Sequence, residues 1–426
     1  MRNAFIVLFC KILSSLTQKL NLGNGSTWPG HIAIRINPHI INQLLKNSRT
    51  KILFIVGTNG KTTTTSLLSH ILTADGKKII HNSSGANLLN GIASILLQNS
   101  TFFGKIDADV ALFEIDENIF PLITKSLRPD AVVALNLFRD QLDRYGEINT
   151  IAEKWRKAIA SLPQSTKLYL NADDPQIAYL GRKAHQEVFY FGLEEKSDAR
   201  LDHAADSTYC PACGNKLLFS TVYYAHLGIW KCPNGDFSRP KPNLYSSDYY
   251  PLSGLYNKYN TIAAMLVAKS LGLTNEDVSK SLRTFSPAFG RQEKITYHHK
   301  HVEIILAKNP AGFNQTLQTI NELKAKNILF VLNDRIADGK DVSWIWDVDF
   351  EKLQKDKKTI TISGDRVYDM ALRCKYAGLE SKSKNNLEEA ISYALSQMEK
   401  NETLFIIPTY TAMLEVRKII TGKKIL

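Results

Sequence analysis

The residues best suited to chemistry in this sequence follow an apolar run at 51–56. After it come Gly57-Thr58-Asn59-Gly60-Lys61-Thr62-Thr63 and then a periodic apolar stretch, which is the pattern of buried strand, glycine loop and helix. Glycines let backbone N–H groups approach phosphate oxygens, and a helix N-terminus adds positive partial charge. Lys61 would reach the β- and γ-phosphates of a nucleotide, and the Thr62 hydroxyl would bind Mg²⁺. We therefore predict a phosphate-binding loop at 57–63; the alternative is a glycine-rich turn with a solvated lysine.

A second candidate is Glu114, which lies at the end of the apolar run 110–115. Ligands in open α/β sheets bind at the carboxyl ends of the strands, so a carboxylate there can hold a metal that bridges phosphates. We predict that Glu114 and Thr62 bind Mg²⁺. Asp116 and Glu117 follow directly, and their alternative role is to cap the next helix.

These residues must be positioned by alternating strands and helices. Such alternation predicts a parallel α/β sheet, and a second alternation predicts another α/β unit nearer the C-terminus. The apolar runs that we interpret as strands are 131–137, 168–170, 188–191, 302–307, 328–332 and 403–407. The periodic stretches that we interpret as helices are 150–162, 261–271, 312–325 and 366–375.

We divide the 426 residues into three parts. Residues 1–40 form an N-terminal helix (3–20) and lead-in, 41–292 a central domain and 293–426 a C-terminal α/β domain. The central domain carries an insert at 203–245, where prolines, aromatics and cysteines interrupt the α/β rhythm. The His-rich stretch 297–301 near the last boundary is interpreted as an exposed hairpin or linker.

Composition limits the class of protein. Hydrophobic residues make up 44% and charged residues 22%, which excludes a disordered, collagenous or coiled-coil chain. The net charge of +12 favours an anionic partner. Five cysteines are too few for a disulfide scaffold and indicate a reducing compartment, so we expect a cytoplasmic protein. No apolar run approaches the roughly 20 residues of a membrane span, and helix 3–20 either packs on the body or touches a membrane surface.

The insert contains half of a zinc-ribbon pattern, Cys210-Pro-Ala-Cys213-Gly. The second half begins at Cys232, but Gly235 occupies the position of its second cysteine. Three thiolates leave a tetrahedral site open, so either a fourth ligand completes a structural zinc site or the metal has been lost. The candidates for that ligand are Asp236, His226 and water.

Several motifs together resemble the Mur ligase family, ATP-dependent amide-forming enzymes of peptidoglycan synthesis that are related to folylpolyglutamate synthase. The motifs are the 57–63 loop, Glu114 after a strand, Asn171-Ala-Asp-Asp-Pro, Gly254-Leu-Tyr-Asn257-Lys-Tyr-Asn260 and Gly290-Arg291-Gln-Glu293. The cysteine insert, Asn333-Asp-Arg-Ile-Ala-Asp-Gly and Trp344-Ile-Trp-Asp347-Val-Asp349 narrow the resemblance to MurT-like members of the family. It extends from about residue 30 to the C-terminus.

The resemblance implies a reaction and a set of roles. MurT-like proteins use ATP to amidate the α-carboxyl of D-glutamate in the stem peptide of lipid II, through an acyl phosphate that ammonia attacks. Asn257 and Asn260 would lie near the nucleotide base; the alternative for both is helix capping before 261–271. Arg291 would lie between the domains near the phosphates; its alternative is a surface ion pair with Glu293.

One motif departs from the family pattern. Many Mur ligases carry Asp-Tyr-Ala-His-Asn-Pro where this chain has Ile305-Leu-Ala-Lys308-Asn309-Pro310, so the Asp and His are missing. That absence fits a nucleophile as small as ammonia, which has no carboxylate to clamp. It speaks against the alternative of a ligase that adds an amino acid.

The reaction requires a source of ammonia. No cysteine of this chain lies on a tight turn near a His, which is the sequence setting expected of a glutaminase nucleophile. The resemblance implies a separate GatD-like glutamine amidotransferase, to whose catalytic His Asp347 or Asp349 would reach; helix capping and surface charge are the alternatives for these two. A nucleic-acid-binding ATPase is disfavoured because the insert carries few basic residues. A non-catalytic scaffold is disfavoured by the intact loop and Glu114.

Overall fold

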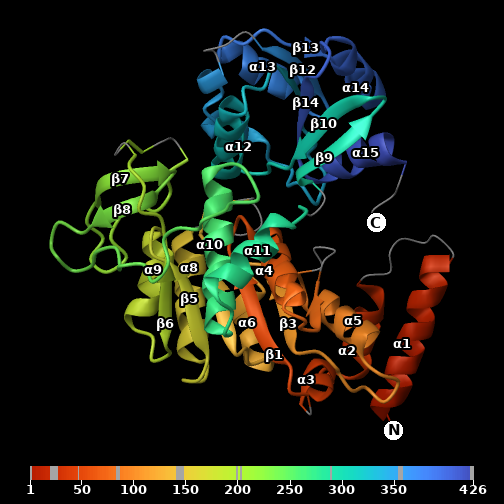
Figure 1. Ribbon diagram of the computed structural model, residues 1–426, viewed down its shortest axis with the longest axis vertical. Helices are drawn as coiled ribbons and strands as arrows, with labels where there is room; N and C mark the ends of the chain where they lie inside the picture. Colours follow the sequence, from red (N-terminus) through yellow and green to blue (C-terminus); the bar gives the residue numbers. More distant parts are fainter. Residues whose placement is uncertain are drawn as a thin grey trace.

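The computed structural model describes residues 2–19, 27–46, 48–82, 87–140, 148–197, 200–201, 204–287, 290–353 and 358–422. Leu20, where the predicted N-terminal helix ends, and residue 203, where the predicted insert begins, lie outside these ranges. Figure 1 shows a central α/β domain below, a C-terminal α/β domain above and a small hairpin unit beside them.

The central domain is built on a parallel sheet with the strand order β2-β3-β1-β4-β5-β6. Its strands are β1 (Lys51–Val56), β2 (Ile79–His81), β3 (Val110–Glu114), β4 (Ala131–Ala134), β5 (Lys167–Asn171) and β6 (Val188–Phe191). Ile55 of β1 pairs with Glu114 of β3, and Val56 pairs with Ala134 of β4. The segments that follow these three strands therefore leave the sheet side by side at one edge.

Helices cover both faces of this sheet, which explains why its strands are continuous apolar runs. Phe54 points into the layer formed by α5 (Leu89–Asn99), α6 (Phe120–Ser126), α8 (Ile148–Ala160) and α9 (Pro175–Arg182). Ile55 points into the opposite layer, formed by α4 (Lys61–Ala74), α10 (Leu255–Ser270) and α11 (Asn275–Arg283). Helix α10 begins at Leu255, six residues before the predicted start of this helix at 261.

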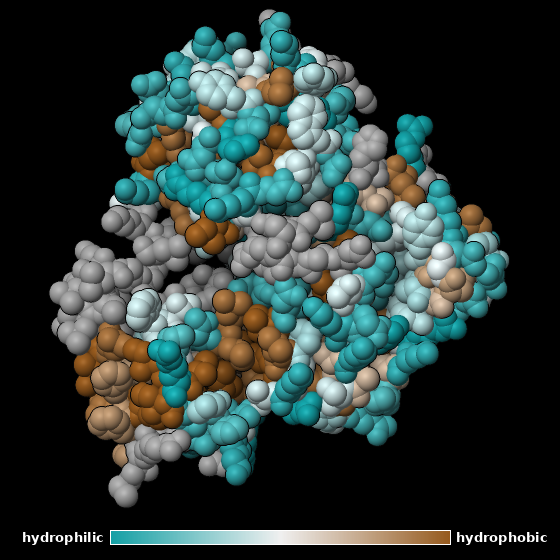
Figure 2. Space-filling view, turned by 180° about the vertical axis from the view of Figure 1, so that it is seen from behind, coloured by the Kyte–Doolittle hydropathy of each residue, from teal (hydrophilic) through white to brown (hydrophobic). Residues whose placement is uncertain are grey.

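The N-terminal helices pack outside α5. They are α1 (Arg2–Lys19), α2 (Trp28–Ile36) and α3 (Ile40–Leu45). Within the described part of the chain, no helix combines the length and apolar character needed to cross a bilayer. Seen from behind, apolar side chains gather on the side of the molecule where these helices lie (Figure 2).

The insert contributes an antiparallel hairpin of β7 (Leu218–Tyr224) and β8 (Leu227–Lys231). The three cysteines lie at its open end, because Leu218 pairs with Lys231 and Cys232 follows directly. His226 lies in the turn at the other end, about 17 Å away along a five-residue strand.

The C-terminal domain is a second six-stranded sheet, in the order β13-β12-β11-β14-β10-β9. Its strands are β9 (Arg291–Tyr297), β10 (Lys300–Ile305), β11 (Asn327–Val331), β12 (Thr359–Ser363), β13 (Lys382–Ser383) and β14 (Thr403–Pro408). One face packs on α12 (Pro310–Glu322), the 3₁₀ helices η1 (Ser343–Asp347) and η2 (Phe350–Leu353), and α13 (Val367–Tyr376). The other face packs on α14 (Leu387–Ser396) and α15 (Tyr410–Thr421).

The β9–β10 hairpin accounts for the His-rich stretch. Among the described strands of this sheet only β9 pairs antiparallel, and His298 and His299 form the exposed turn with φ of 46° and 61°. The domain division predicted between 292 and 293 falls inside β9, which begins at Arg291.

Candidate active site

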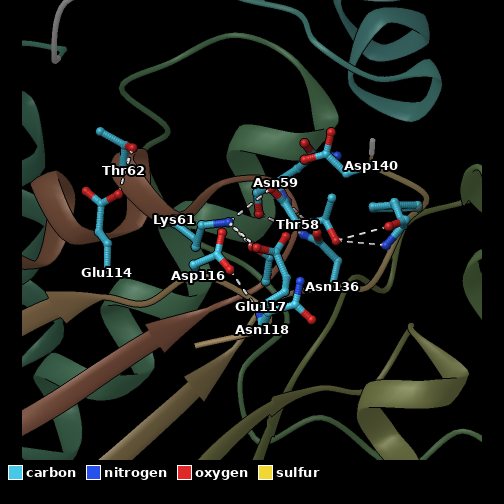
Figure 3. Close-up of polar contacts among 12 residues, drawn as sticks. Thr58, Asn59, Lys61, Thr62, Glu114, Asp116, Glu117, Asn118, Asn136 and Asp140 are labelled. Carbon is cyan, nitrogen blue, oxygen red and sulfur yellow. Dashed lines mark hydrogen bonds and ion pairs between the residues drawn. The ribbon is translucent and has the colours of Figure 1, made fainter. Parts of the chain in front are cut away.

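The predicted phosphate loop connects the carboxyl end of β1 to the first turn of α4. Gly60 caps α4 with φ of 91°, and a Cβ atom at this position would lie 2.1 Å from Asn260 Oδ1. Asn136, which follows β4, accepts a hydrogen bond from the Asn59 N–H at 2.9 Å and donates one to the Asn59 carbonyl at 3.0 Å (Figure 3). The loop is therefore fixed by the neighbouring strand, and only glycine fits at position 60.

Lys61 folds back over this loop and is almost completely buried (Figure 3). Its Nζ donates to the carbonyl of Gly57 and, at 3.3 Å, to that of Thr58. The Nζ also lies 3.3 Å from Glu117 Oε2, a contact between residues far apart in sequence. An ammonium held beside the backbone N–H groups of the loop is positioned to neutralise phosphate oxygens.

Glu114 ends β3 and faces the first turn of α4. Thr62 Oγ1 donates to Glu114 Oε2 at 2.9 Å, and the Asn82 side chain bonds both backbone groups of Glu114 at 2.9 Å. Burial raises the pKa of Glu114, against the opposing effects of the Thr62 hydrogen bond and the charges of Lys61 and Arg291. A hydroxyl and a buried carboxylate are oxygen donors that fit Mg²⁺, whose charge would offset the effect of burial.

Asp116 and Glu117 are neighbours in sequence but make different contacts. Asp116 Oδ1 accepts from the Asn118 N–H at 3.0 Å and organises the turn before α6. Glu117 faces Lys61 instead, and burial raises the pKa of its carboxyl while Lys61 and Lys308 oppose that shift. The N-cap of α6 is Ile119, so the capping interpretation is wrong for both Asp116 and Glu117.

These groups share a cleft of ≈ 480 Å³ between the central and C-terminal domains. The central domain contributes Thr58, Asn59, Gly60, Lys61, Thr62, Asn87, Leu88, Glu114, Asp116 and Glu117 to its lining. The C-terminal domain contributes Arg291, Leu306, Ala307, Lys308, Gly312, Ile336, Ala337 and Tyr410. One wall thus carries the loop and the carboxylates, and the other carries two cations.

Lys308 is one of those cations. Its Nζ donates to Asp140 of the central domain. Burial alone would lower the pKa of Lys308, but the carboxylates of Asp140 and Glu117 outweigh it and raise that pKa. The neighbouring Asn309 exchanges two side-chain hydrogen bonds with Asn59, at 3.0 and 3.3 Å, so the C-terminal domain also touches the phosphate loop.

Asn257 and Asn260 lie within the first two turns of α10, whose N-cap is Gly254. The alternative that they cap this helix is therefore wrong. Asn260 Nδ2 donates to Asn257 Oδ1 at 3.1 Å, and Thr64 Oγ1 donates to Asn260 Oδ1 at 3.3 Å. Both asparagines line a narrow pocket of ≈ 50 Å³ that adjoins the loop at Gly60.

Arg291 lines both this pocket and the cleft. Burial lowers the pKa of its guanidinium, and the negative charge of Glu114 opposes that shift. Glu293 instead binds Arg417, with both N···O distances at 2.8 Å. The alternative of an Arg291–Glu293 surface pair is therefore wrong.

The two C-terminal aspartates have different surroundings. Asp349 is mostly buried, and its carboxylate lies 2.8 Å from Lys352 Nζ. The Asn314 side chain donates to this carboxylate and accepts from the Asp349 N–H, which holds Asp349 at the start of η2. Asp347 is 44% exposed, and its Oδ2 lies 3.2 Å from Arg139 Nη1. Of the two, only Asp347 is open to a partner on the surface.

The three clustered cysteines are brought together as their spacing predicts. The Sγ atoms of Cys210, Cys213 and Cys232 lie within 4.8 Å of one another, and Asp236 Oδ2 lies 3.9 Å from Cys232 Sγ. His226 is wrong as a fourth ligand, because it lies at the far end of the hairpin. There its Nδ1 accepts from the Asp206 N–H at 3.2 Å and its Nε2 lies 3.4 Å from Asp174 Oδ2.

Comparison with known proteins agrees with this architecture. The Mur ligase middle domain matches residues 55–268, and the MurT ligase C-terminal domain matches residues 306–413. A pseudomurein peptide ligase type C from Methanothermus fervidus shares the fold with a TM-score of 0.65 and 24% identity over 90% of this chain and 81% of that one. A Mycobacterium tuberculosis folylpolyglutamate synthase, solved with ADP and AMPPCP, covers 94% of this chain and 99% of its own, with a TM-score of 0.59 and 16% identity.

Curated relatives from Staphylococcus and Streptococcus carry the name lipid II isoglutaminyl synthase (glutamine-hydrolyzing) subunit MurT. The protein from Staphylococcus aureus (strain COL) is 36% identical over 375 residues, which cover 84% of each chain. The protein from Streptococcus pneumoniae (strain ATCC BAA-255 / R6) is 34% identical, with 95% of this chain and 94% of that one covered. With both halves matched and the loop, carboxylates and cleft in place, the chain belongs to the MurT family of Mur-ligase-like proteins.

Proposed function

We propose that this chain is the ATP-using subunit of a carbon–nitrogen ligase that converts the α-carboxyl of D-glutamate in lipid II to the amide of D-isoglutamine. The observation that carries this proposal is the convergence of Lys61, Thr62 and Glu114 on one wall of a cleft whose other wall holds Arg291 and Lys308. The reaction would take place in the cytoplasm at the inner face of the plasma membrane, where ATP and a lipid-linked precursor meet.

The first step transfers the γ-phosphoryl group of ATP to the carboxylate. A carboxylate oxygen attacks the γ-phosphorus, the bond to the bridging oxygen breaks, and ADP leaves with its electron pair. Both reactants are anions, so the cations in the cleft have to offset their repulsion. Lys61 lies beside the loop and Arg291 beside Glu114, and Mg²⁺ held by Thr62 and Glu114 would neutralise phosphate charge when bound.

In the second step ammonia attacks the acyl carbon and phosphate leaves, so that the nitrogen loses one proton and an amide forms. Ammonia carries no carboxylate that the enzyme must recognise. Lys308 is consistent with this, because it is engaged with Asp140 and replaces a residue that helps position an amino acid in relatives. This contact favours amidation over addition of an amino acid.

A glutaminase partner, which we take to be GatD-like, would supply the ammonia. All five cysteines lie in described parts of the chain, and none has the setting of a nucleophile. Burial raises the pKa of Cys374 to about 12 and also raises that of Cys10, while the other three cluster together. Next to Asp347 an exposed apolar strip offers a docking face; it consists of Trp346, Tyr368, Leu372 and Tyr376.

We expect Asp347→Asn to lower glutamine hydrolysis by the assembled complex by about 10²-fold, because an aspartate that orients a catalytic His contributes through its charge. Asp349→Asn should change the rate less than about twofold, because Asp349 is bound within its own domain. Glutamate release by the purified pair of subunits measures both rates. Normal rates in both variants would show that neither aspartate contributes to the glutaminase site of the partner.

We also propose a structural zinc ion at Cys210, Cys213 and Cys232, with Asp236 as the nearest candidate for the fourth ligand. The support is the short separation of the three sulfurs at the open end of the hairpin. Metal analysis of the purified chain should give about one zinc per chain, and Cys210→Ser should lose it. A zinc content near zero in the unaltered chain would mean that packing alone holds the hairpin.

Reconstitution tests the proposed function as a whole. The chain, a GatD-like glutaminase, glutamine, Mg-ATP and lipid II should together yield amidated lipid II, with ADP, phosphate and glutamate formed in equal amounts. Omission of either protein should stop product formation from glutamine, whereas added ammonia should replace the partner. Production of a peptide-extended lipid II instead would favour an amino-acid-adding ligase.

A further inference from the structure

The N-terminal helix α1 has one buried face and one exposed face. Ile6, Val7 and Cys10 are buried against the neighbouring helices, although α1 lies at the edge of the molecule (Figure 1). The opposite side exposes large apolar side chains to solvent. These are Phe5, Leu8, Phe9 and Ile12.

A loop from elsewhere in the sequence extends this exposed surface. Phe103 is 90% exposed at the loop tip, beside the exposed Phe102. Lys11 of α1 connects the two segments, since its Nζ donates to the Gln98 carbonyl at 3.1 Å and lies 5.5 Å from the centre of the Phe102 ring. We call Phe5, Leu8, Phe9, Ile12, Phe102 and Phe103 the apolar face; Figure 2 shows apolar side chains gathered on this side.

The N-terminal quarter of the sequence, which contributes the apolar face, is strongly basic. Residues 1–106 contain eleven Lys and Arg but a single carboxylate, Asp75, so this quarter of the chain carries most of the +12 net charge. Lys11 lies within the face and Lys105 is exposed beside Phe103. The next carboxylate in sequence, Asp107, is already paired with Lys78 at 2.8 Å. An exposed apolar surface in a basic surround complements a bilayer with anionic headgroups.

Helix α5 connects this surface to the cleft. Asn87 and Leu88, just before α5, line the cleft, and the loop with Phe102 and Phe103 follows its other end. An eleven-residue helix is about 16 Å long, so the apolar face lies roughly one helix length from the reacting groups. That separation suits a substrate whose stem peptide projects from a lipid anchor.

We propose that the apolar face inserts into the headgroup region of an anionic phospholipid bilayer and holds the cleft near its membrane-anchored substrate. The aromatic and aliphatic side chains of α1 and the 101–105 loop enter the interface, while Lys11, Lys105 and their basic neighbours contact lipid phosphates. This inference rests on the proposed function for its purpose, but the surface itself is tested independently of turnover.

Co-sedimentation with vesicles tests the proposal on the full chain with its partner bound. The unaltered complex should bind phosphatidylglycerol vesicles, and Phe5→Ser/Phe103→Ser should weaken that binding by about 10-fold or more, because two aromatic side chains lose their apolar insertion. Lys105→Glu should weaken binding to phosphatidylglycerol and leave the weak binding to phosphatidylcholine unchanged. Tyr245→Ser replaces an exposed aromatic next to β6, at the opposite edge of the central sheet from β2; it is the matched control and should have no effect.

Several outcomes would overturn the proposal. Equal binding of the unaltered complex and the double variant would do so, as would the absence of any preference for anionic vesicles. A change of oligomeric state in the double variant, measured by light scattering, would show that a second copy covers the face. Amidation of a water-soluble lipid II analogue should stay within about twofold of normal in the double variant; if the unaltered complex fails on that analogue too, the proposed function fails and not the docking surface.

Discussion

Replacement of Lys61 by alanine should reduce ATP-dependent amidation of lipid II by about 10³-fold. Lys61 is the cation held at the phosphate loop, by the carbonyls of Gly57 and Thr58. Removal of one preorganised group that faces transition-state charge typically costs 10²–10³-fold in rate, and here the reaction joins two anions. The amide formed per minute in the reconstituted system measures the effect.

Two further variants separate charge from geometry. Lys61→Arg keeps the charge but cannot reproduce a compact ammonium in a buried position, so it should recover little activity. Lys77→Ala removes a lysine just after the same helix, where Lys77 pairs with the exposed Asp75, and should be close to normal. If Lys61→Ala folds normally and keeps more than a tenth of the activity, Lys61 is not part of the phosphoryl-transfer site.

Glu114→Gln should lower amidation by about 10²-fold and raise the Mg²⁺ concentration needed for half-maximal rate. Glutamine keeps the size of the side chain and can still accept the Thr62 hydrogen bond, but it removes the charge that would attract the metal. A magnesium titration at saturating ATP distinguishes weaker metal binding from a general loss of activity.

Asp116→Asn provides the matched control for Glu114. Asp116 lies two residues further on and also lines the cleft, but its carboxylate accepts a local turn hydrogen bond that asparagine can also accept. We expect less than about a 10-fold loss and an unchanged magnesium requirement. Equal magnesium shifts in both variants would mean that the negative charge of the whole segment matters and that Glu114 is not a specific ligand.

The local pattern of apolar residues and glycines was sufficient to predict the elements that carry the phosphate loop. The apolar run 51–56 and the glycines after it are contiguous in sequence, so strand, turn and helix could each be predicted there. The start of α10 could not be predicted from local pattern, because Asn257 and Asn260 are polar residues on a buried helical turn. Asn260 packs on Gly60 and also bonds Asn257, and apolar periodicity does not reveal a contact between residues two hundred positions apart.

Contacts between distant parts of the chain also explain the other site features that the sequence did not predict. The contact of Glu117 with Lys61 depends on β1 and β3 being neighbours, and that of Lys308 with Asp140 depends on how two domains meet. Cysteine spacing predicted the sulfur cluster because its first two members are close in sequence. His226 was a reasonable ligand candidate by distance along the chain, but the hairpin carries it to the opposite end.

The most direct test of carboxylate activation follows an oxygen atom of the substrate carboxyl group into the released phosphate. Lipid II with ¹⁸O in the D-glutamate α-carboxyl should be amidated by the chain, its partner, Mg-ATP and glutamine, and the released phosphate analysed by mass spectrometry. If ATP phosphorylates the carboxylate, each amide formed sends one labelled oxygen into inorganic phosphate. Phosphate that contains no label, while amide is formed at the normal rate, would contradict the account.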